Sequence, residues 1–255
     1  MIHLPSMRAL RMWQRNRDVF VRLWWSLAPA FMIEPILLLL AIGLGFGSYI
    51  GVIQGQDYIN YIVPGILASY AMTTATFEAT YGAYFRMEYR RTYDAIMATP
   101  LNIEDIVTGE ILWGATRSVI TAAIILVVAL FFGLLQSWWA ILIPVAAGLV
   151  GFMFSCLAII FVSVASSVYS FNYYFTLFIA PMTFFSGAFF PLDNLPSAVG
   201  NISPFLPLTH SVKLMRALVS GDFTAATLGS LAIVIIATVI LFLIAAMVMR
   251  RRVME

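Results

Sequence analysis

The sequence contains very little charge. Only 10% of its 255 residues are Asp, Glu, Lys or Arg, whereas 62% are hydrophobic and the mean hydropathy is +0.95. A water-soluble globular domain is about half apolar and about a quarter charged, so this composition excludes that class. The chain is therefore predicted to be a membrane protein that crosses the bilayer several times.

Cysteine, lysine and histidine are almost missing, and each shortage excludes a kind of site. Cys156 is the single cysteine, so we expect a buried, inert thiol and neither an intramolecular disulfide nor a cysteine metal site. Lys213 is the single lysine and follows Val212, which rules out the Gly-Lys-Ser/Thr of a Walker A motif. His3 and His210 alone make no metal site. We expect no cofactor and no catalytic residues in this chain.

Six apolar stretches are long enough to cross a bilayer, which takes about 20 residues of helix. Runs such as ILLLLAIGLGFG do not alternate apolar and polar residues, and this excludes the strands of a β-barrel. The fold class is therefore all-α, a single polytopic domain over residues 1–255. Its expected transmembrane helices are residues 29–50, 59–85, 106–135, 138–165, 168–190 and 225–249.

Arginines gather at three places, which predicts the orientation. By the positive-inside rule these three regions are cytoplasmic, and six spans bring both termini to that side. Because the basic residues report topology, a nucleic-acid partner is not implied. The three groups are Arg8, Arg11, Arg15, Arg17 and Arg22, then Arg86, Arg90 and Arg91, and finally Arg250, Arg251 and Arg252.

The first 28 residues are both basic and aromatic. They have no compact apolar core and no small-residue cleavage site, so we do not expect a cleavable signal peptide. Trp13, Phe20 and Trp24 are interleaved among the arginines, which indicates an amphipathic helix lying along the cytoplasmic surface. A plain solvated helix is the alternative, and the tryptophans argue against it.

A polar segment, EYRRTYDAIMATPLNIEDI (residues 88–106), interrupts the apolar sequence after the second expected span. A helical reading pairs Arg90 with Asp94, and Glu88 with Arg91, along one face. The other face carries an apolar and aromatic stripe. An apolar stripe rimmed by charge predicts a docking surface for another protein; a helix lying flat on the head groups is the alternative. The stripe on the other face consists of Tyr89, Tyr93, Ile96 and Met97.

Local signals also mark where this helix ends. Pro100 stops it, since the residue before a proline disfavours the helical conformation. Asn102 suits the N-cap of the next helix, and Glu104 and Asp105 then lie in its first turn, where the helix dipole favours acids.

The segment 191–222, on the expected outer face, is divided by Pro191, Pro196, Pro204 and Pro207 into pieces too short to span the bilayer. The last piece places Leu208, Val212, Met215 and Val219 on one face. We expect short helices that re-enter the outer leaflet, with a connecting loop of ordinary turn prolines as the alternative.

Four charged residues fall inside the expected spans: Glu34, Glu78, Glu110 and Arg117. Ionisable residues in a membrane indicate a pathway, a pair or a gate, and pairing is favoured here over ligand contact. Glu110 and Arg117 share a helical face, but about 10 Å separates them along the axis, too far for a direct bond. Glu34 precedes Pro35 and is expected at a helix end.

The fifth expected span carries a phenylalanine stripe at spacings of four and three. Such a stripe can face lipid, a partner helix or an amphiphile, and ordinary packing is the simplest interpretation. We keep it as a candidate part of the pathway. The stripe consists of Phe171, Phe175, Phe178, Met182, Phe185 and Phe189, and its five phenylalanines are the candidate pathway residues.

Two stretches resemble a known family. YRRTYDAIMATPL, followed by EDIVTGEIL, is similar to the cytoplasmic loop of permease subunits in the type 2 ABC exporter family, particularly the branch with nodulation-factor (lipo-oligosaccharide) and drug exporters. FFSGAFFPLDNLPSAVGNISPFLPLTHSVKLMRALVSGD (residues 184–222) resembles that family's outer-face segment. Many members carry glycine before the threonine of the first motif; here Arg91 takes that place, which is closer to the lipo-oligosaccharide branch.

The resemblance implies a role for the whole chain. Residues 86–101 would form a coupling helix seated in a separate ABC-type ATPase subunit, present in two copies, which binds ATP and Mg. A second permease chain would complete a homodimer in the bacterial inner membrane and export an amphipathic or lipid-linked substrate. The residues implied in ATPase coupling are Arg86, Tyr89, Arg90, Arg91, Tyr93, Asp94, Ile96 and Met97.

Two other functions are open. A membrane-embedded lipid-modifying enzyme would use His210 or an intramembrane carboxylate as acid or base, and activity of the purified chain without nucleotide would favour it. An ion-coupled carrier would show internal inverted repeats, and the sequence shows no convincing one.

Overall fold

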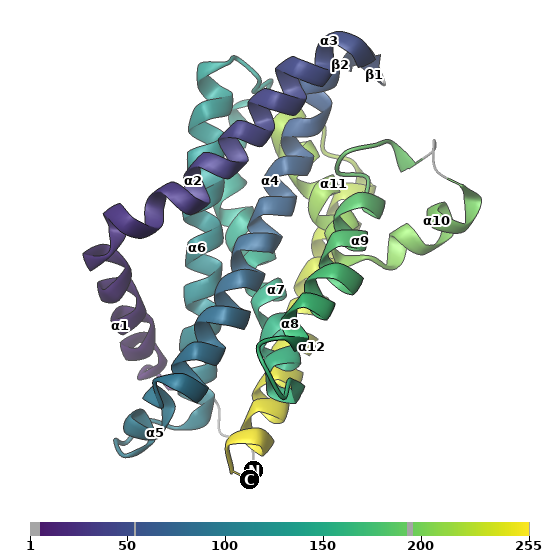
Figure 1. Cartoon of the computed structure of the whole chain (residues 1–255). Helices are drawn as coiled ribbons and strands as arrows, with labels where there is room; N and C mark the ends of the chain where they lie inside the picture. Colours follow the sequence, from purple (N-terminus) through teal and green to yellow (C-terminus); the bar gives the residue numbers. More distant parts are fainter. Residues whose placement is uncertain (1–5, 54, 193–195, 255) are drawn as a thin grey trace.

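The computed structural model describes residues 6–53, 55–192 and 196–254, and their fold is all-α apart from one small hairpin (Figure 1). The prediction of an all-α chain is therefore confirmed. Along the chain the elements are α1 (Ala9–Arg22), α2 (Trp24–Leu40), η1 (Ala41–Phe46), α3 (Gly47–Ile50), β1 (Val52–Ile53), β2 (Gln56–Asp57), α4 (Tyr58–Phe77), η2 (Glu78–Gly82), η3 (Phe85–Tyr89), α5 (Thr92–Met97), α6 (Ile103–Phe131), η4 (Trp138–Leu142), α7 (Ile143–Val164), α8 (Ser170–Tyr174), η5 (Phe175–Ile179), α9 (Ala180–Phe185), α10 (Ser197–Ile202), η7 (Ser203–Phe205), α11 (Pro207–Ser220) and α12 (Ala225–Met254).

Three of the described helices are long and apolar enough to cross a membrane: Ile103–Phe131, Trp138–Val164 and Ala225–Val253. The first two pack very closely because small residues face each other. A Cβ atom added at Gly114 would clash with Ser155 Oγ, and one added at Gly151 would clash with Ser118 Oγ. Small residues at such contacts let helix backbones approach in a membrane.

The other three expected spans correspond to continuous helical stretches, residues 24–50, 58–89 and 170–185, each containing π-helical turns. The π-helical segments are η1, η2 with η3, and η5. A π-helical turn holds more residues than an α-helical turn, so it shifts every later side chain around the axis. The number of six spans remains a prediction.

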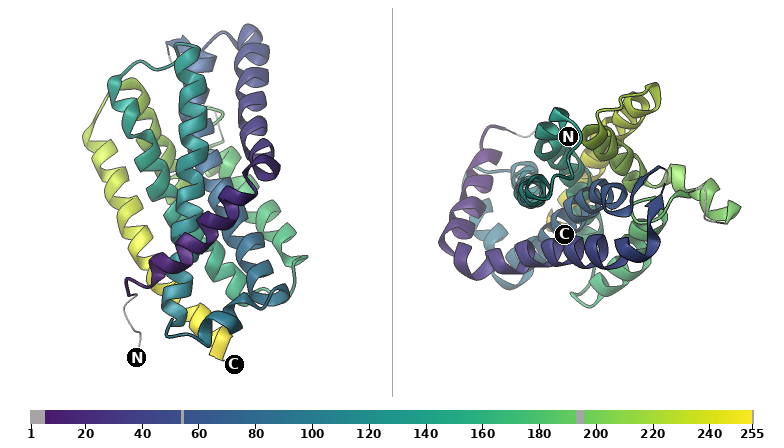
Figure 2. Two further views of the ribbon diagram at one scale, coloured as in Figure 1. Left: turned by 90° about the vertical axis from the view of Figure 1, so that its left-hand side faces the viewer. Right: turned by 90° about the horizontal axis from the view of Figure 1, so that it is seen from above.

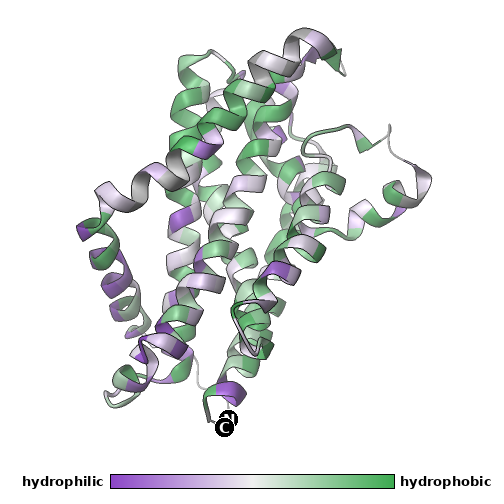
Figure 3. Cartoon of the chain, viewed as in Figure 1, coloured by the Kyte–Doolittle hydropathy of each residue, from purple (hydrophilic) through white to green (hydrophobic). Residues whose placement is uncertain are grey.

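The polar parts of the chain gather at one end. Helix α5, the beginning of α1 and the end of α12 lie together there, whereas the β1–β2 hairpin lies at the opposite end (Figures 1 and 2). Coloured by hydropathy, α1, α5 and the last turn of α12 carry most of the polar residues of that end (Figure 3). The grouping agrees with the arginine pattern of the sequence.

Helix α1 is amphipathic, and its buried face packs on α6. The packing is tight, since a Cβ added at Gly109 would lie 2.5 Å from Met12 Cβ. At Leu23 the chain changes direction and α2 begins (Figure 1). Whether α1 also rests on a membrane surface stays a prediction. Its buried residues are Ala9, Met12, Asn16 and Phe20.

The expected outer-face segment forms α10, η7 and α11, and the structure does not describe its residues 193–195. Helix α11 buries its apolar face against α4 and α12. That face therefore packs inside the protein and does not face lipid, and membrane re-entry stays a prediction. The predicted stripe is buried in full: Leu208, Val212, Met215 and Val219.

Candidate functional site

A buried carboxylate, Glu110 of α6, is the centre of a polar network at the end of the molecule where α5 lies. Arg86 donates to it twice, from Nε to Oε1 at 2.7 Å and from Nη2 to Oε2 at 2.6 Å. Asn16 Nδ2 of α1 donates to Oε2 at 3.2 Å, and Tyr93 Oη of α5 donates to Oε1 at 3.2 Å. Glu110 is 1% exposed, and four hydrogen bonds to a buried carboxylate offset its loss of hydration.

The network continues along η2 and back to α6. Arg86 Nη1 lies 3.0 Å from Glu78 Oε1, and Glu78 Oε2 lies 3.8 Å from Arg117 Nε. Burial alone would lower the pKa of Arg86, but the carboxylates of Glu110 and Glu78 raise it above its usual value. Glu110 and Arg117 are thus linked through a neighbouring helix, as their separation along α6 requires.

Tyr93 does not lie on an exposed docking stripe, contrary to the sequence interpretation. Its side chain is 2% exposed and points to Glu110, whereas Tyr89 is 68% exposed. The reason is Arg91, whose left-handed backbone (φ 44°, ψ 35°) turns the chain between η3 and α5. Residues 89 and 93 therefore belong to two differently directed helices, and the spacing rule does not connect them.

The remaining residues of the expected coupling segment divide into two groups. Ile96 and Met97 are partly buried against the core, and Arg86 is held in the network. Arg90, Arg91 and Asp94 are exposed with Tyr89 and Ala95. Neither of the two ion pairs expected on this helix forms within the described part of the chain, and Glu88 pairs instead with Arg252 of α12 at 2.9 Å.

The loop after α5 is fixed by its neighbours. Asn102 and Asp105 form a capping box at the start of α6, which confirms the predicted N-cap. Ser6 N donates to Asp105 Oδ1 at 2.6 Å, and Arg250 Nη1 of α12 donates to Glu104 Oε1 at 3.1 Å. Both ends of the chain therefore hold the segment that contains α5.

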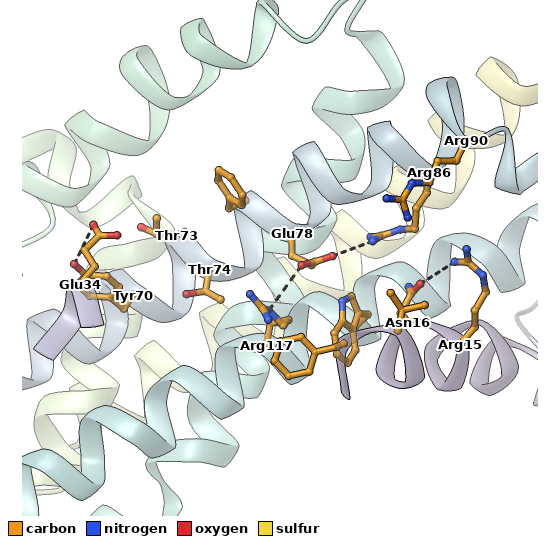
Figure 4. A pocket seen from close by; sticks show the side chains of 14 residues that line it. Arg15, Asn16, Glu34, Tyr70, Thr73, Thr74, Glu78, Arg86, Arg90 and Arg117 are labelled. Atoms are coloured by element: carbon orange, nitrogen blue, oxygen red, sulfur yellow. Dashed lines mark hydrogen bonds and ion pairs between the residues drawn. The ribbon is translucent and has the colours of Figure 1, made fainter. Parts of the chain in front are cut away.

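A cavity of about 430 Å³ lies next to the network, between α1, α2, α4 with η2 and η3, and α6. Figure 4 shows Arg15, Arg86 and Arg90 at one end and the Glu34–Tyr70 hydrogen bond of 3.3 Å at the other. Glu34 is not at a helix end, because α2 continues through Pro35.

The same cavity brings together three of the four intramembrane charges that the sequence singled out. Glu34, Glu78 and Arg117 line it, whereas Glu110 lies behind it in the network. Two further lining residues, Arg15 and Tyr70, were missed. Asn16, also missed, carried a signal: it occupies the buried face of α1 four residues from both Met12 and Phe20.

The phenylalanine stripe is not one face. Phe171 is fully buried against Tyr81 and Tyr84, whereas Phe178 is 60% exposed and Phe185 is 41% exposed. Phe175 and Phe189 are partly buried against the core. The π-helical segment η5 shifts the later side chains around the axis, and α9 ends at Phe185. As far as the structure describes the cavity, its lining includes none of the five.

His210 has a structural role in the packing of α11. Its Nε2 lies 2.8 Å from Pro204 O, and its Nδ1 lies 3.3 Å from Ser230 Oγ. Both ring nitrogens are therefore engaged with α11's neighbours. No carboxylate contacts the ring among the described residues, so this histidine gives no support to an acid or base in lipid chemistry.

Comparison with known proteins agrees with the motifs. The family model described as ABC-2 type transporter matches residues 8–220. The chain is 36% identical over 248 residues to Nodulation protein J of Rhizobium leguminosarum bv. viciae, which covers 96% of this chain and 95% of that protein. It is 22% identical over 216 residues to the Inner membrane transport permease YadH of Escherichia coli (strain K12), covering 85% and 84%. The resemblance inferred from the two motifs is confirmed.

Proposed function

This chain belongs to the ABC-2 type transporter family, and we propose that it is the membrane-spanning subunit of an exporter driven by ATP in a separate ATPase subunit. The partner would supply the ATP and Mg chemistry, since this sequence has no Walker A motif. We propose two ATPase subunits and two permease chains in the complex, and the bacterial inner membrane as its location.

One observation carries the coupling part of this proposal: Tyr93 of α5 and Arg86 of η3 bind the same carboxylate, Glu110. A force applied to α5 by a partner protein would reach α6 through Tyr93, and α1 through Asn16. The network is buried and hydrogen-bonded on both Glu110 oxygens, so it transmits displacement better than exposed side chains would.

The proposed docking surface is the exposed side of the segment from the end of η3 through α5. Its residues are Tyr89, Arg90, Arg91, Asp94 and Ala95. Aspartate at both Tyr89 and Ala95 places unpaired charge into that contact, which costs several kcal/mol and should abolish retention of the ATPase subunit in a pull-down. Neither side chain is buried, so the variant should still insert and fold.

A matched control changes Phe223 and Thr224 to aspartate. Both residues are exposed, and they lie just before the start of α12, whose other end lies near α5. It should retain the ATPase subunit and export. Full retention by the Tyr89 and Ala95 variant would instead make α5 a helix that only lies on the membrane surface.

A second copy of this chain is proposed to cover apolar residues of α2 and of the 170–185 helix. Ile33 and Leu37 on α2 are 51% and 58% exposed, and Tyr173 and Leu177 are 68% and 65% exposed. Native mass spectrometry of the active complex tests this: two permease chains are expected, and one would refute the dimer.

The proposed cargo is an amphipathic or lipid-linked molecule, with a lipo-oligosaccharide as the first choice. The support is the similarity, at 36% identity over 96% of the chain, to a protein named for nodulation. The test is ATPase stimulation of the reconstituted complex by a panel of lipo-oligosaccharides, glycolipids and drugs. Stimulation by none of them would overturn this choice of substrate class.

A further inference from the structure

The cavity beside α1 has more positively than negatively charged side chains in its wall, and the proposed coupling network gives no reason for this excess. Four arginines but two glutamates are among its lining residues. The arginines Arg15, Arg86 and Arg90 lie together at one end, and Thr73 and Thr74 lie between that end and Glu34 (Figure 4). A volume of about 430 Å³ is in the range of small-molecule sites.

Two of these arginines form no ion pair with the acids that the structure describes. Glu110 and Glu78 are engaged with Arg86. Among the described residues, no carboxylate oxygen lies within 4.0 Å of the guanidinium of Arg15 or Arg90. Within the described part of the chain, the one hydrogen bond that Arg15 donates goes to the neutral amide of Asn16, at 3.1 Å.

Repulsion among the arginines adds to this imbalance. Burial lowers the pKa of Arg15, Arg86 and Arg90 lower it further, and Glu110 offsets only part of this effect. An oxyanion placed between Arg15 and Arg90 would relieve the repulsion and accept charge-assisted hydrogen bonds. A guanidinium group is planar and can donate two parallel hydrogen bonds to two oxygens of one phosphate group.

Part of the wall between the arginines and the Glu34–Tyr70 end is apolar. Phe20, Phe77 and Trp113 line the cavity beyond the arginines, and the hydroxyl groups of Thr73 and Thr74 are neutral. A small hydrated anion would leave this surface without a partner, whereas the chain of a lipid would cover it. The polar and apolar parts together therefore fit one molecule with a charged head and an apolar tail.

We propose that this cavity binds an acidic amphiphile, with its phosphate-type head group between Arg15 and Arg90 and its apolar chain against Phe20, Phe77 and Trp113. The site shares Arg90 with the proposed docking surface, but its other residues lie on α1, α4 and α6, and binding needs neither nucleotide nor an ATPase subunit. The inference therefore does not rest on the proposed export function, and loss of ATPase coupling would leave it intact.

The test is lipid binding to the purified, delipidated full chain in a non-ionic detergent, followed by native mass spectrometry. Phosphatidylglycerol is the acidic amphiphile, phosphatidylcholine the zwitterionic comparison, and inorganic phosphate the head group without a tail. We expect phosphatidylglycerol to bind more tightly than phosphatidylcholine, and inorganic phosphate to compete only weakly.

Two variants address the two parts of the site. Arg15→Gln with Arg90→Gln should weaken phosphatidylglycerol binding by at least about tenfold, because charge-assisted hydrogen bonds are lost. Thr73→Phe fills the cavity without a change of charge and should weaken binding of the same lipid. The control, Arg11→Gln with Arg22→Gln, removes two exposed arginines that do not line this cavity and should bind as the unmodified chain does.

Three results would overturn the proposal. Unchanged phosphatidylglycerol binding in either cavity variant would place the lipid elsewhere. Equal affinity for phosphatidylcholine would show that head-group charge is not recognised. Competition by inorganic phosphate at the same concentration as phosphatidylglycerol would make the site one for free anions.

Discussion

Arg86 and Glu110 form a two-bond ion pair that joins η3 to α6, with N–O distances of 2.7 and 2.6 Å. The side chain of Glu110 is fully buried and that of Arg86 is 14% exposed. A buried pair of this kind contributes little net stability compared with apolar residues, but the loss of one partner is costly. Because Tyr93 of α5 binds the same carboxylate, the pair also belongs to the contacts that join α5 to α6 in the proposed coupling.

Removal of one partner from this pair should be worse than removal of both. Glu110→Leu leaves Arg86 with Glu78 alone and should lower the free energy of unfolding by about 3 kcal/mol or more, whereas adding Arg86→Met should recover most of it. The exposed pair Arg17–Asp18 is the control, since Asp18→Ala should cost about 1 kcal/mol or less. Thermal unfolding in detergent measures all three, and equal loss in the single and double variants would contradict the prediction.

Tyr93 should make stability sensitive to alkaline pH. Burial and then Glu110 raise its pKa well above the ordinary value of about 10. Below pH 10 both folded and unfolded chains keep the proton; above it only the unfolded chain loses it, so the contribution of Tyr93 falls by up to about 1.4 kcal/mol per pH unit.

The comparison that isolates this contribution is Tyr93→Phe. At pH 8 the variant should be less stable by about 1–2 kcal/mol, because a hydrogen bond to a charged acceptor is lost. The difference in thermal midpoint should shrink between pH 10 and 11.5. A difference independent of pH would show that Tyr93 does not titrate in this way.

Gly109 should be needed for the docking of α1 on α6. Alanine there places a Cβ 2.5 Å from Met12 Cβ and 2.9 Å from the carbonyl oxygen of Ala9, so α1 must shift. We expect a loss of about 1–3 kcal/mol and faster hydrogen–deuterium exchange in residues 9–22. Gly229→Ala in α12 is the control, because an added Cβ there meets nothing within 4 Å. Unchanged exchange in the Gly109 variant would disprove the tight contact.

Arg91 should prefer glycine on conformational grounds. Its φ of 44° lies in the left-handed region, where a side chain costs about 1–2 kcal/mol. Arg91→Gly and Arg91→Ala remove the same charge, but the glycine variant should be the more stable by about 1 kcal/mol. Thermal midpoints of the two variants measure this, and a more stable alanine variant would argue against the left-handed turn before α5.

The orientation in the membrane can be tested with single cysteines in a chain whose Cys156 is replaced by alanine. A cysteine at Arg90 or Arg251 should be protected from an impermeant thiol reagent in sealed right-side-out cells, and one at Asp222 should react. All three positions are exposed, so reactivity reports the side of the membrane. Labelling of the Arg90 position from outside would reverse the predicted orientation.

Local chemistry by itself determined several features. Apolar composition over long unbroken runs requires helices, because backbone groups in lipid must bond within their own segment. The capping box at Asn102 and the amphipathic α1 follow from neighbours a few residues apart, and such short-range patterns are legible in sequence. The two motifs identified the family for the same reason, because each is a run of residues in a fixed order that can be read directly from the sequence.

Only the tertiary structure decided what the charged residues bind. Periodicity places Glu110 on a face of α6, but Arg86 and Asn16 reach it from 24 and 94 residues away. Spacing rules also assume an uninterrupted α-helix, and here η5 redirects the phenylalanines while one left-handed residue, Arg91, turns Tyr93 inward. Partners distant in sequence and single changes of backbone direction are settled by the packing of the whole chain, because neither leaves a repeating pattern along it.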